Sequence, residues 1–345
     1  RAPEPCRVIA RLRARDLWNR IAHAAYDCAE PGVIFIDRVN RENNLAYRER
    51  ISATNPCGEV PLPPYGACDL GALNLTGFVR EPFTPRARLD VASLRQLTAV
   101  AVRMLDNVID VSHFPLPQQA QAARGTRRIG LGITGLADAL IMLGMHYAQE
   151  QARRQAAQIA RTICHAAYRA SVRIARQKGT FPYFDEEAYL DAPFVRRLPP
   201  DIQSSIRRGG IRNSHLLSIA PTGTISLLAN NVSSGIEPVF AFRQLRTLRT
   251  EETGLICVEL EDYAHRLWRE LCGDLGGMPS SFIDATALAP ADHLAMQAAL
   301  QPHGDSAISK TINIGTDVPF EDVRSVFRQA FDLGLSYGII SSGLW

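Results

Sequence analysis

The sequence predicts an α/β protein, because segments with helical periodicity alternate with short apolar segments along the whole chain. Three long stretches place apolar residues at helical spacing, over residues 9–29, 93–111 and 151–178. Short apolar runs at residues 33–36 and 216–219 are typical of buried strands. No internal repeat or low-complexity linker interrupts this alternation, so one continuous domain is expected.

The ends of the expected elements follow from glycine and proline as much as from periodicity. The first helix ends before Glu30-Pro31-Gly32, and the third ends at Gly179, a residue type that commonly caps helix C-termini. Later helices are expected over residues 258–271, 292–300 and 320–333, with a strand over residues 308–314. The candidate core positions of the first two helices are Leu12, Leu17, Ile21 and Ala25, then Leu97, Val100, Ala101, Met104, Leu105 and Val108.

Composition narrows the class of protein. The 345 residues are 46% hydrophobic and 21% charged, which is typical of a globular chain with a sizeable core. The net charge of +3 is too small to indicate nucleic-acid or membrane binding, and no apolar run is long enough to span a bilayer. The 7 cysteines contain no Cys-x-x-Cys pair, so a reducing cytoplasm is the expected compartment. The start at Arg1 lacks an initiator Met and a signal sequence, which suggests a chain that begins inside a larger protein.

The most informative motif is Asn55-Pro56-Cys57-Gly58-Glu59. Pro56 disfavours the α region at Asn55, and Gly58 is a poor helix former. If the segment is extended, the side chains of Asn55, Cys57 and Glu59 project to the same side. A redox-capable sulfur, a base and a hydrogen-bonding amide would then share one small volume, which suits chemistry on a polar substrate that needs both a thiol and a base.

A second cysteine supports a functional reading of Cys57. A lone cysteine is most often a small buried hydrophobic residue. Cys68, however, follows across a loop rich in proline and glycine that could bring the two sulfurs together. A cysteine hydrolase that uses Cys57 with a distant histidine is an alternative, although no histidine lies in a recognisable partner context.

A second motif, Pro221-Thr222-Gly223-Thr224-Ile225-Ser226, follows the strand expected at residues 216–219. Its hydroxyls and backbone N–H groups could bind a phosphate, although it lacks the Gly-Lys-Ser/Thr element of a Walker loop. A Ser/Thr-rich turn is the alternative, and on local sequence alone it is the commoner outcome.

Two other patterns resemble binding motifs but are not assigned a binding function. Gly130-Leu131-Gly132-Ile133-Thr134-Gly135 matches the dinucleotide glycine pattern, but a basic loop and not a strand is expected before it, so close helix packing is the preferred interpretation. His165 beside Cys164 and His265 near Cys272 lack zinc spacing, so no metal ligands are assigned.

These segments together resemble the catalytic subunit of ribonucleotide reductase, and most closely its adenosylcobalamin-dependent (class II, vitamin B12-dependent) type. The resemblance implies part of a ten-stranded α/β barrel with the reactive cysteine on an internal loop. Residues 1–335 would be the C-terminal portion of that barrel, with its N-terminal strands missing, and residues 336–345 a divergent tail. The matching stretches run in the family's order. They are Glu30-Pro31-Gly32-Val33-Ile34-Phe35-Ile36-Asp37, Thr54 to Glu59 through Pro64-Tyr65-Gly66, Leu70-Gly71-Ala72-Leu73-Asn74-Leu75, Arg128-Ile129-Gly130-Leu131-Gly132, Ala220 to Ser226, Ser234-Gly235-Ile236-Glu237-Pro238 and Ser309-Lys310-Thr311-Ile312-Asn313.

The resemblance also implies roles for matching residues. Cys57 would carry a thiyl radical that abstracts the 3′ hydrogen of a ribonucleotide, which is expected to be a diphosphate. Glu59 would act as general base, Asn55 would hydrogen-bond the ribose, and Cys68 would be one of two reducing thiols. The substrate would contact Asn55, Pro56, Cys57, Gly58 and Glu59, with its phosphates on Pro221, Thr222, Gly223, Thr224, Ile225 and Ser226. The cofactor would be adenosylcobalamin, and the partners a thioredoxin-like reductant and the N-terminal half of the barrel.

The chain departs from the family pattern at both ends. No residue matches the second reducing cysteine, and residues 336–345 do not match the expected barrel strand with its Cys-Thr sequence. A catalytically incomplete fragment that retains nucleotide phosphate binding is therefore an alternative to an active reductase.

Overall fold

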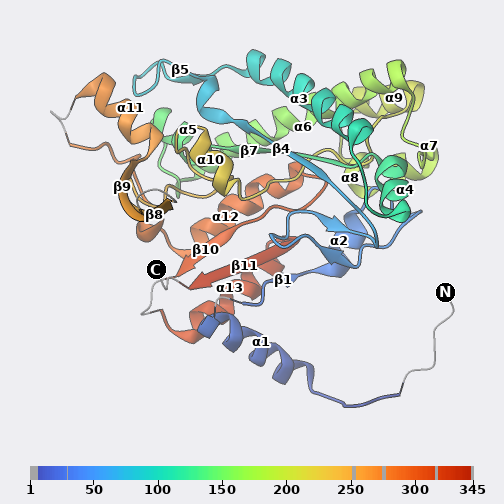
Figure 1. Cartoon of the computed structure of the whole chain (residues 1–345), viewed down its shortest axis with the longest axis horizontal. Coiled ribbons are helices and arrows are strands. Elements are labelled where there is room, and N and C mark those ends of the chain that lie inside the picture. Colours follow the sequence, from blue (N-terminus) through green and yellow to red (C-terminus); the bar gives the residue numbers. More distant parts are fainter. Residues whose placement is uncertain (1–6, 29, 251–253, 274–276, 315–317, 343–345) are drawn as a thin grey trace.

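The computed structural model describes residues 7–28, 30–250, 254–273, 277–314 and 318–342, in which helices surround a set of short strands (Figure 1). The α-helices are α1 (Ala14–Cys28), α2 (Ile36–Glu42), α3 (Val91–Val111), α4 (Pro117–Thr126), α5 (Leu136–Met142), α6 (Glu150–Lys178), α7 (Glu186–Asp191), α8 (Pro193–Arg196), α9 (Pro200–Gly209), α10 (Gly223–Leu228), α11 (Tyr263–Cys272), α12 (Pro290–Leu300) and α13 (Phe320–Asp332). Short 3₁₀ helices are η1 (Leu75–Phe78), η2 (Ala285–Ala287) and η3 (Gln301–His303). The α/β class predicted from the sequence is confirmed.

The strands are short and belong to several pairings. They are β1 (Val33–Ile34), β2 (Ala53–Thr54), β3 (Pro61–Leu62), β4 (Asp69–Asn74), β5 (Val79–Arg80), β6 (Arg88–Leu89), β7 (Ile129–Thr134), β8 (Arg243–Thr250), β9 (Gly254–Glu261), β10 (Thr311–Ile314) and β11 (Tyr337–Ser342). β2 and β3 form one antiparallel pair, β5 and β6 a second, and β8 and β9 a long hairpin.

Parallel pairings join the central segments into one series. β4 pairs with β7 from Asp69↔Ile129 to Asn74↔Thr134. Leu131 of β7 then bridges Leu217, and Ile219 bridges Ile308, both in parallel orientation. The chain continues from Ile308 into β10, which pairs in parallel with β11, and β1 closes this side antiparallel to β11. The order is therefore β4, β7, residues 216–219, residues 308–314 and β11, all running in one direction.

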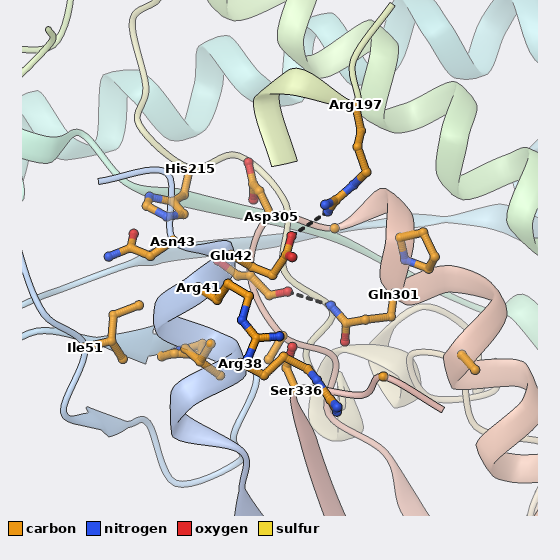
Figure 2. A pocket seen from close by; sticks show the side chains of 18 of the residues that line it. Arg38, Arg41, Glu42, Asn43, Ile51, Arg197, His215, Gln301, Asp305 and Ser336 are labelled. Atoms are coloured by element: carbon orange, nitrogen blue, oxygen red, sulfur yellow. Dashed lines mark hydrogen bonds and ion pairs between the residues drawn. The ribbon is translucent and has the colours of Figure 1, made fainter. Parts of the chain in front are cut away.

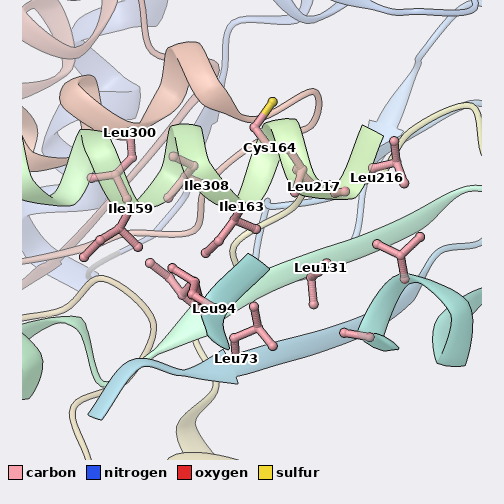
Figure 3. Close-up of a cluster of buried hydrophobic side chains, with 14 of the residues drawn as sticks. Leu73, Leu94, Leu131, Ile159, Ile163, Cys164, Leu216, Leu217, Leu300 and Ile308 are labelled. Carbon is pink, nitrogen blue, oxygen red and sulfur yellow. The ribbon is translucent and has the colours of Figure 1, made fainter. Parts of the chain in front are cut away.

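The main hydrophobic core lies between this series and the long helices α3, α6 and α12. Figure 3 shows Leu73 and Leu131 of the strands facing Leu94 of α3 and Ile159 and Ile163 of α6. α6 is 29 residues long and buries a stripe that includes Ala152, Ala156, Ile159, Ile163 and Ala167, because small and branched residues recur at helical spacing. A smaller core joins α1, α13 and β10, where Trp18 packs edge-on against Phe327. The parallel strand series is thus packed against α3, α6 and α12 through the main core, and against α1 and α13 through the smaller core.

Several sequence expectations are confirmed and others are wrong in a specific way. The second and third helices form as predicted, and Gly179 is the C-cap of α6 with a φ of 84°. The apolar stripe predicted for α3 is confirmed at Ala101 and Leu105, which are buried. It is wrong at the exposed residues Leu97, Val100, Met104 and Val108, and Leu94, Val102 and Ile109 are buried instead. α3 carries apolar residues on both faces, so periodicity alone does not identify the core side. The first helix begins only at Ala14, so Leu12 lies before it. Leu12 and Leu17 are exposed, whereas Ala25 is buried as predicted, together with Ala22.

Two strand regions also differ from the expectations. The helix expected over residues 258–271 begins only at Tyr263, because residues 254–261 form β9 of the hairpin. Residues 337–342 form β11, where no barrel strand was expected. The assignment of residues 336–345 to a divergent tail stays a prediction, and residues 343–345 lie outside the described residues.

The glycine pattern of β7 was assigned to helix packing, and this is wrong. Residues 129–134 are themselves a buried strand. A Cβ on Gly132 would lie 2.5 Å from the carbonyl oxygen of Ser218, and one on Gly130 would lie 2.5 Å from the Leu70 side chain and 3.2 Å from the sulfur of Cys68. Glycine is therefore required for the close approach of neighbouring strand segments.

Candidate active site

Residues 55–59, here called the thiol turn, form a tight turn between β2 and β3. The N–H of Asn55 donates to the Val60 carbonyl at 3.2 Å, and the N–H of Gly58 donates to the Asn55 carbonyl at 3.0 Å. The Asn55 side-chain oxygen accepts the N–H of Val60 at 2.9 Å, and Gly58 has a φ of 82°. The extended conformation predicted for this motif is therefore wrong, because Asn55 closes a hairpin and Gly58 supplies the left-handed residue that it needs.

The turn exposes its thiol and buries its carboxylate. Cys57 is exposed, whereas Glu59 is 2% exposed. The carbonyl of Glu59 accepts hydrogen bonds from the Ala307 N–H at 3.0 Å and from the Ser218 hydroxyl at 2.8 Å. Among the described residues the side-chain oxygen Oε2 of Glu59 has no hydrogen-bond partner. A buried carboxylate oxygen without a partner is costly, so this atom is available to a ligand.

The electrostatics link Glu59 to both candidate thiols. Partial burial and then the Glu59 carboxylate raise the pKa of Cys57. Burial raises the pKa of Cys68 to about 12, where Arg128 opposes the shift and Glu59 adds to it. Both sulfurs therefore keep their protons at neutral pH. An S–H group is a hydrogen-atom donor, whereas a nucleophilic hydrolase needs a thiolate. The cysteine hydrolase alternative is disfavoured, and within the described ranges no histidine hydrogen-bonds Cys57.

Residues 221–226, here called the hydroxyl loop, follow directly from the segment that holds the thiol turn. Thr222 is 8% exposed with a φ of 58°. Its hydroxyl lies 2.9 Å from that of Thr134 and accepts the Gly235 N–H at 2.7 Å. The Ser226 hydroxyl donates to the Gly223 carbonyl at 2.8 Å and lies 3.1 Å from the Ser234 hydroxyl. These two hydroxyls hold the loop, and Gly223 and Thr224 are exposed.

The hydroxyl loop borders a cleft of about 850 Å³. Gly223, Thr224 and Ser226 line one part of it, and Glu237 and Thr311 line another. Thr134, which contacts the loop, is the last residue of β7, so the cleft lies at the carboxyl ends of the parallel strands. Ligands of open parallel sheets bind at this end.

A second cavity of about 410 Å³ lies elsewhere, between α2 and the 3₁₀ helix η3 (Figure 2). Figure 2 shows an ion pair between Arg197 and Glu42 at its edge, with a distance of 2.6 Å. Asp305 lines the cavity and accepts the N–H groups of Leu216 and Leu217 at 2.9 and 2.8 Å. None of the site residues predicted from the sequence lines this cavity, although Ala307, whose N–H donates to the Glu59 carbonyl, does.

Three residues of the cleft region were not assigned a role from the sequence. Lys310 is 1% exposed, and its ammonium contacts the Glu237 carboxylate and the His293 ring. Lysine occurs in this chain only as Lys178 and Lys310, and that rarity is a signal that could have drawn attention to Lys310. The contact itself spans 73 residues of sequence, which no local pattern reveals.

Within the described ranges no group of three or more His, Cys, Asp or Glu side chains is placed to hold a metal ion. In the same part of the chain no helix has both the length and the apolar character needed to cross a bilayer.

The fold and the site define an α/β protein in which a cysteine turn is hydrogen-bonded to the central parallel strand segments and a hydroxyl-rich loop borders a polar cleft. The sequence model described as "Ribonucleotide reductase, barrel domain" matches residues 4–340. The chain belongs to this family.

Individual relatives agree with the family assignment. The chain is 39% identical to a vitamin B12-dependent ribonucleoside-diphosphate reductase of Mycobacterium tuberculosis over 95% of this chain and 47% of that protein. It is 34% identical to a protein of the same name from Thermoplasma acidophilum, over 96% of this chain and 43% of that protein. A ribonucleoside-diphosphate reductase subunit alpha of Chlamydia pneumoniae is 28% identical over 68% of this chain and 24% of that protein. The chain thus spans about half the length, or less, of these curated relatives.

Proposed function

We propose that this chain supplies the cysteine-bearing part of the catalytic barrel of a vitamin B12-dependent ribonucleotide reductase that converts ribonucleoside diphosphates to deoxyribonucleotides. The observation that carries the proposal is the double use of residues 216–219. The Ser218 hydroxyl donates to the Glu59 carbonyl and so holds the thiol turn. The hydroxyl loop begins at Pro221, two residues after the end of the same strand segment. A thiol, a carboxylate and a phosphate-binding loop are thereby fixed to one strand segment.

The proposed chemistry assigns one step to each residue of the thiol turn. A thiyl radical on Cys57 takes the 3′ hydrogen of the ribose to form an S–H bond, and after the reduction it returns that hydrogen to C3′, which regenerates the thiyl radical. Glu59, whose Oε2 has no hydrogen-bond partner among the described residues, accepts the 3′-hydroxyl proton as the 2′-hydroxyl leaves as water. Asn55 hydrogen-bonds the ribose. Cys68 and a second thiol supply the two electrons and two protons of the reduction and become a disulfide.

The residues present fit a cofactor that generates a radical. A thiol that is to give up a hydrogen atom must be protonated and accessible, and Cys57 is exposed with a raised pKa. When bound, adenosylcobalamin would supply the initiating radical. Cys57 is the residue of this chain that the proposal places next to it.

The partners proposed are the rest of the barrel and a thioredoxin-like reductant. β4 pairs with β7 on one side, and no strand in the described ranges pairs with its other side. An open strand edge favours pairing with further strands. The N-terminal half of a ten-stranded barrel would cover this edge and bring the second reducing cysteine.

Reconstitution tests the function. This chain would be co-expressed with the N-terminal half of the Mycobacterium tuberculosis relative, and formation of dCDP from CDP measured with adenosylcobalamin and dithiothreitol. The proposal expects cobalamin-dependent dCDP formation by the complex and none by either half alone. A stable complex that forms no dCDP would contradict it.

A second candidate is a catalytically incomplete protein that binds nucleotide phosphates. The exposed backbone of Gly223 and Thr224 at the cleft favours it, since such binding needs no second thiol. Calorimetry with CDP on the chain alone tests this, with Thr222→Ala and Ser226→Ala as variants that loosen the loop. Binding that is absent, or unchanged in both variants, would count against it.

A further inference from the structure

An ion pair between Glu237, which lines the cleft, and the fully buried Lys310 lies at the wall of the cleft. Lys310 is 1% exposed, and its ammonium group is within hydrogen-bond distance of the Glu237 carboxylate, of His293 Nδ1 at 2.7 Å and of the Thr311 carbonyl at 2.6 Å. These three acceptors match the three N–H donors of an ammonium group. Lysine is almost never fully buried unless it is paired, so this network requires an explanation.

Within this network Glu237 is the partner that balances the charge of Lys310. Burial, and then the Lys310 charge, lower the pKa of His293 to about 3, so the imidazole is neutral and accepts through Nδ1. His293 is completely buried, and its Nε2 has no hydrogen-bond partner in the described part of the chain. Burial lowers the pKa of Lys310, and the Glu237 carboxylate opposes that shift. The Glu237 carboxylate therefore favours the charged form of Lys310.

Glu237 also connects two separate parts of the chain. Its Oε1 accepts the backbone N–H of Thr311 at 2.7 Å, at the start of β10. Its own N–H donates to the Ser234 carbonyl at 2.7 Å, which closes the turn formed by residues 233–238. The Glu237 carboxylate thus makes two contacts, one with Lys310 and one with the Thr311 N–H. The second contact connects the turn to the parallel strand series.

The turn of residues 233–238 in turn fixes the hydroxyl loop. The N–H of Gly235 donates to the Thr222 hydroxyl at 2.7 Å, and the Ser234 hydroxyl lies 3.1 Å from that of Ser226. A Cβ on Gly235, whose φ is 51°, would lie 2.7 Å from the Ala220 carbonyl oxygen. The turn and the loop are therefore in contact closely enough that a shift of one displaces the other.

We propose that Glu237, held by Lys310, is a positioning residue that sets the conformation of the hydroxyl loop. It acts through Gly235 and Ser234, and it is itself anchored by the link to Thr311 on β10. The proposed function enters this inference at one point only, because it supplies the reason for positioning the loop, namely to present it to substrate phosphates. The positioning itself is a property of this chain with or without a nucleotide.

Paired substitutions test the positioning without leaving a buried charge uncompensated. The double variant Glu237→Ala with Lys310→Met is neutral and loses the link to Thr311. The double variant Glu237→Gln with Lys310→Met is also neutral, but its amide oxygen can still accept the Thr311 N–H. The control is Glu321→Ala with Arg324→Met, which removes an exposed ion pair on α13.

Hydrogen–deuterium exchange of the 345-residue chain, followed by mass spectrometry over residues 219–238, gives the result. We expect about tenfold faster exchange there in the alanine double variant, unchanged exchange in α6, and near-original exchange in the glutamine double variant and the control. Unchanged exchange over residues 219–238 in the alanine double variant would overturn the inference, as would equally fast exchange in the folded glutamine double variant.

Calorimetry with CDP on the same proteins separates this inference from the proposed function. If the unaltered chain binds CDP, the alanine double variant is expected to bind about tenfold more weakly and the glutamine double variant to recover. Equal binding by all of them would overturn the inference. If the unaltered chain binds no CDP, the proposal that this chain alone binds nucleotides is contradicted. The exchange result still decides the positioning role of Glu237.

Discussion

The hydroxyl of Ser218 donates a 2.8 Å hydrogen bond to the carbonyl of Glu59, so the central strand segment holds the thiol turn directly. Both groups are buried, and the same carbonyl also accepts the N–H of Ala307. The turn is therefore fixed by two neighbouring strand segments, which orients Cys57 and Glu59 before any ligand arrives. Such preorganisation matters because hydrogen-atom transfer requires near-contact geometry.

Removing this hydrogen bond should destabilise the chain measurably. For Ser218→Ala we expect a loss of about 1 kcal/mol in the free energy of unfolding, since one of the two bonds to a buried carbonyl is lost. Urea unfolding followed by circular dichroism measures it. The matched control is Ser205→Ala, which removes a partly exposed 2.7 Å bond to the Asp201 carbonyl on α9 and should cost less. Equal losses at the two sites would contradict the special role of Ser218.

The glycines of β7 provide a test of the strand series. Gly132→Ala would place a Cβ 2.5 Å from the Ser218 carbonyl oxygen, so strand backbone must move. We expect a loss of about 2–3 kcal/mol in the free energy of unfolding. Gly77→Ala is the control, because a Cβ on Gly77 would meet nothing within 4 Å, and it should change stability by about 1 kcal/mol or less. A Gly132 variant as stable as the control would mean that the segments are farther apart than described.

The raised pKa of Cys57 predicts slow alkylation at mildly alkaline pH. A raised pKa means less thiolate at a given pH, so the rate with iodoacetamide at about pH 8 should be low and should keep rising above about pH 9. Glu59→Gln removes the carboxylate that contributes to the shift, and alkylation at the lower pH should become faster. Mass spectrometry follows each site, with the exposed Cys28 and Cys272 as internal references and Glu321→Gln as the control variant. A rate at Cys57 that Glu59→Gln leaves unchanged would contradict the proposed proximity.

A buried carboxylate fixes α3 to the segment that precedes β7. Asp106 is completely buried and accepts from Arg127 Nε at 2.8 Å and from Asn213 at 3.0 Å. Asp106→Asn leaves buried Arg127 without its main counter-charge and should cost about 3–5 kcal/mol of unfolding free energy. Glu150→Gln breaks an exposed pair with Arg154 and should cost about 0.5 kcal/mol or less. Thermal melting and urea titration would compare them, and a difference below about 1 kcal/mol would argue against the buried network.

The parts of the fold that the sequence predicted are those set by local periodicity. α6 and its Gly179 cap follow from the 3.6-residue repeat and from the conformational freedom of glycine. The core face of α3 was mispredicted because that helix has apolar residues on both sides. Residues 258–261 of β9 were read as the start of a helix because they lie directly before α11, although Ile256, Val258 and Leu260 follow a two-residue alternation.

The sequence singles out a set of candidate site residues, whose roles stay a prediction, but it does not predict their geometry. The thiol turn was recognised from its composition, yet its extended conformation was wrong because the closing bonds to Val60 and Ser218 decide the backbone. Glu237 and Lys310 meet only through the tertiary fold. Local sequence therefore indicates which groups carry chemistry, whereas distant contacts decide how those groups are held.

The most direct test of the central claim is the turnover of Cys57→Ser in the complex reconstituted with the N-terminal half of the barrel. With CDP, adenosylcobalamin and dithiothreitol, the account predicts that this variant forms no dCDP above background, because a hydroxyl does not replace the thiol as the radical carrier. Cys272→Ser, which changes an exposed cysteine at the end of α11, should retain the rate of the unaltered complex. Full turnover by Cys57→Ser would contradict the assignment of Cys57 as the radical site.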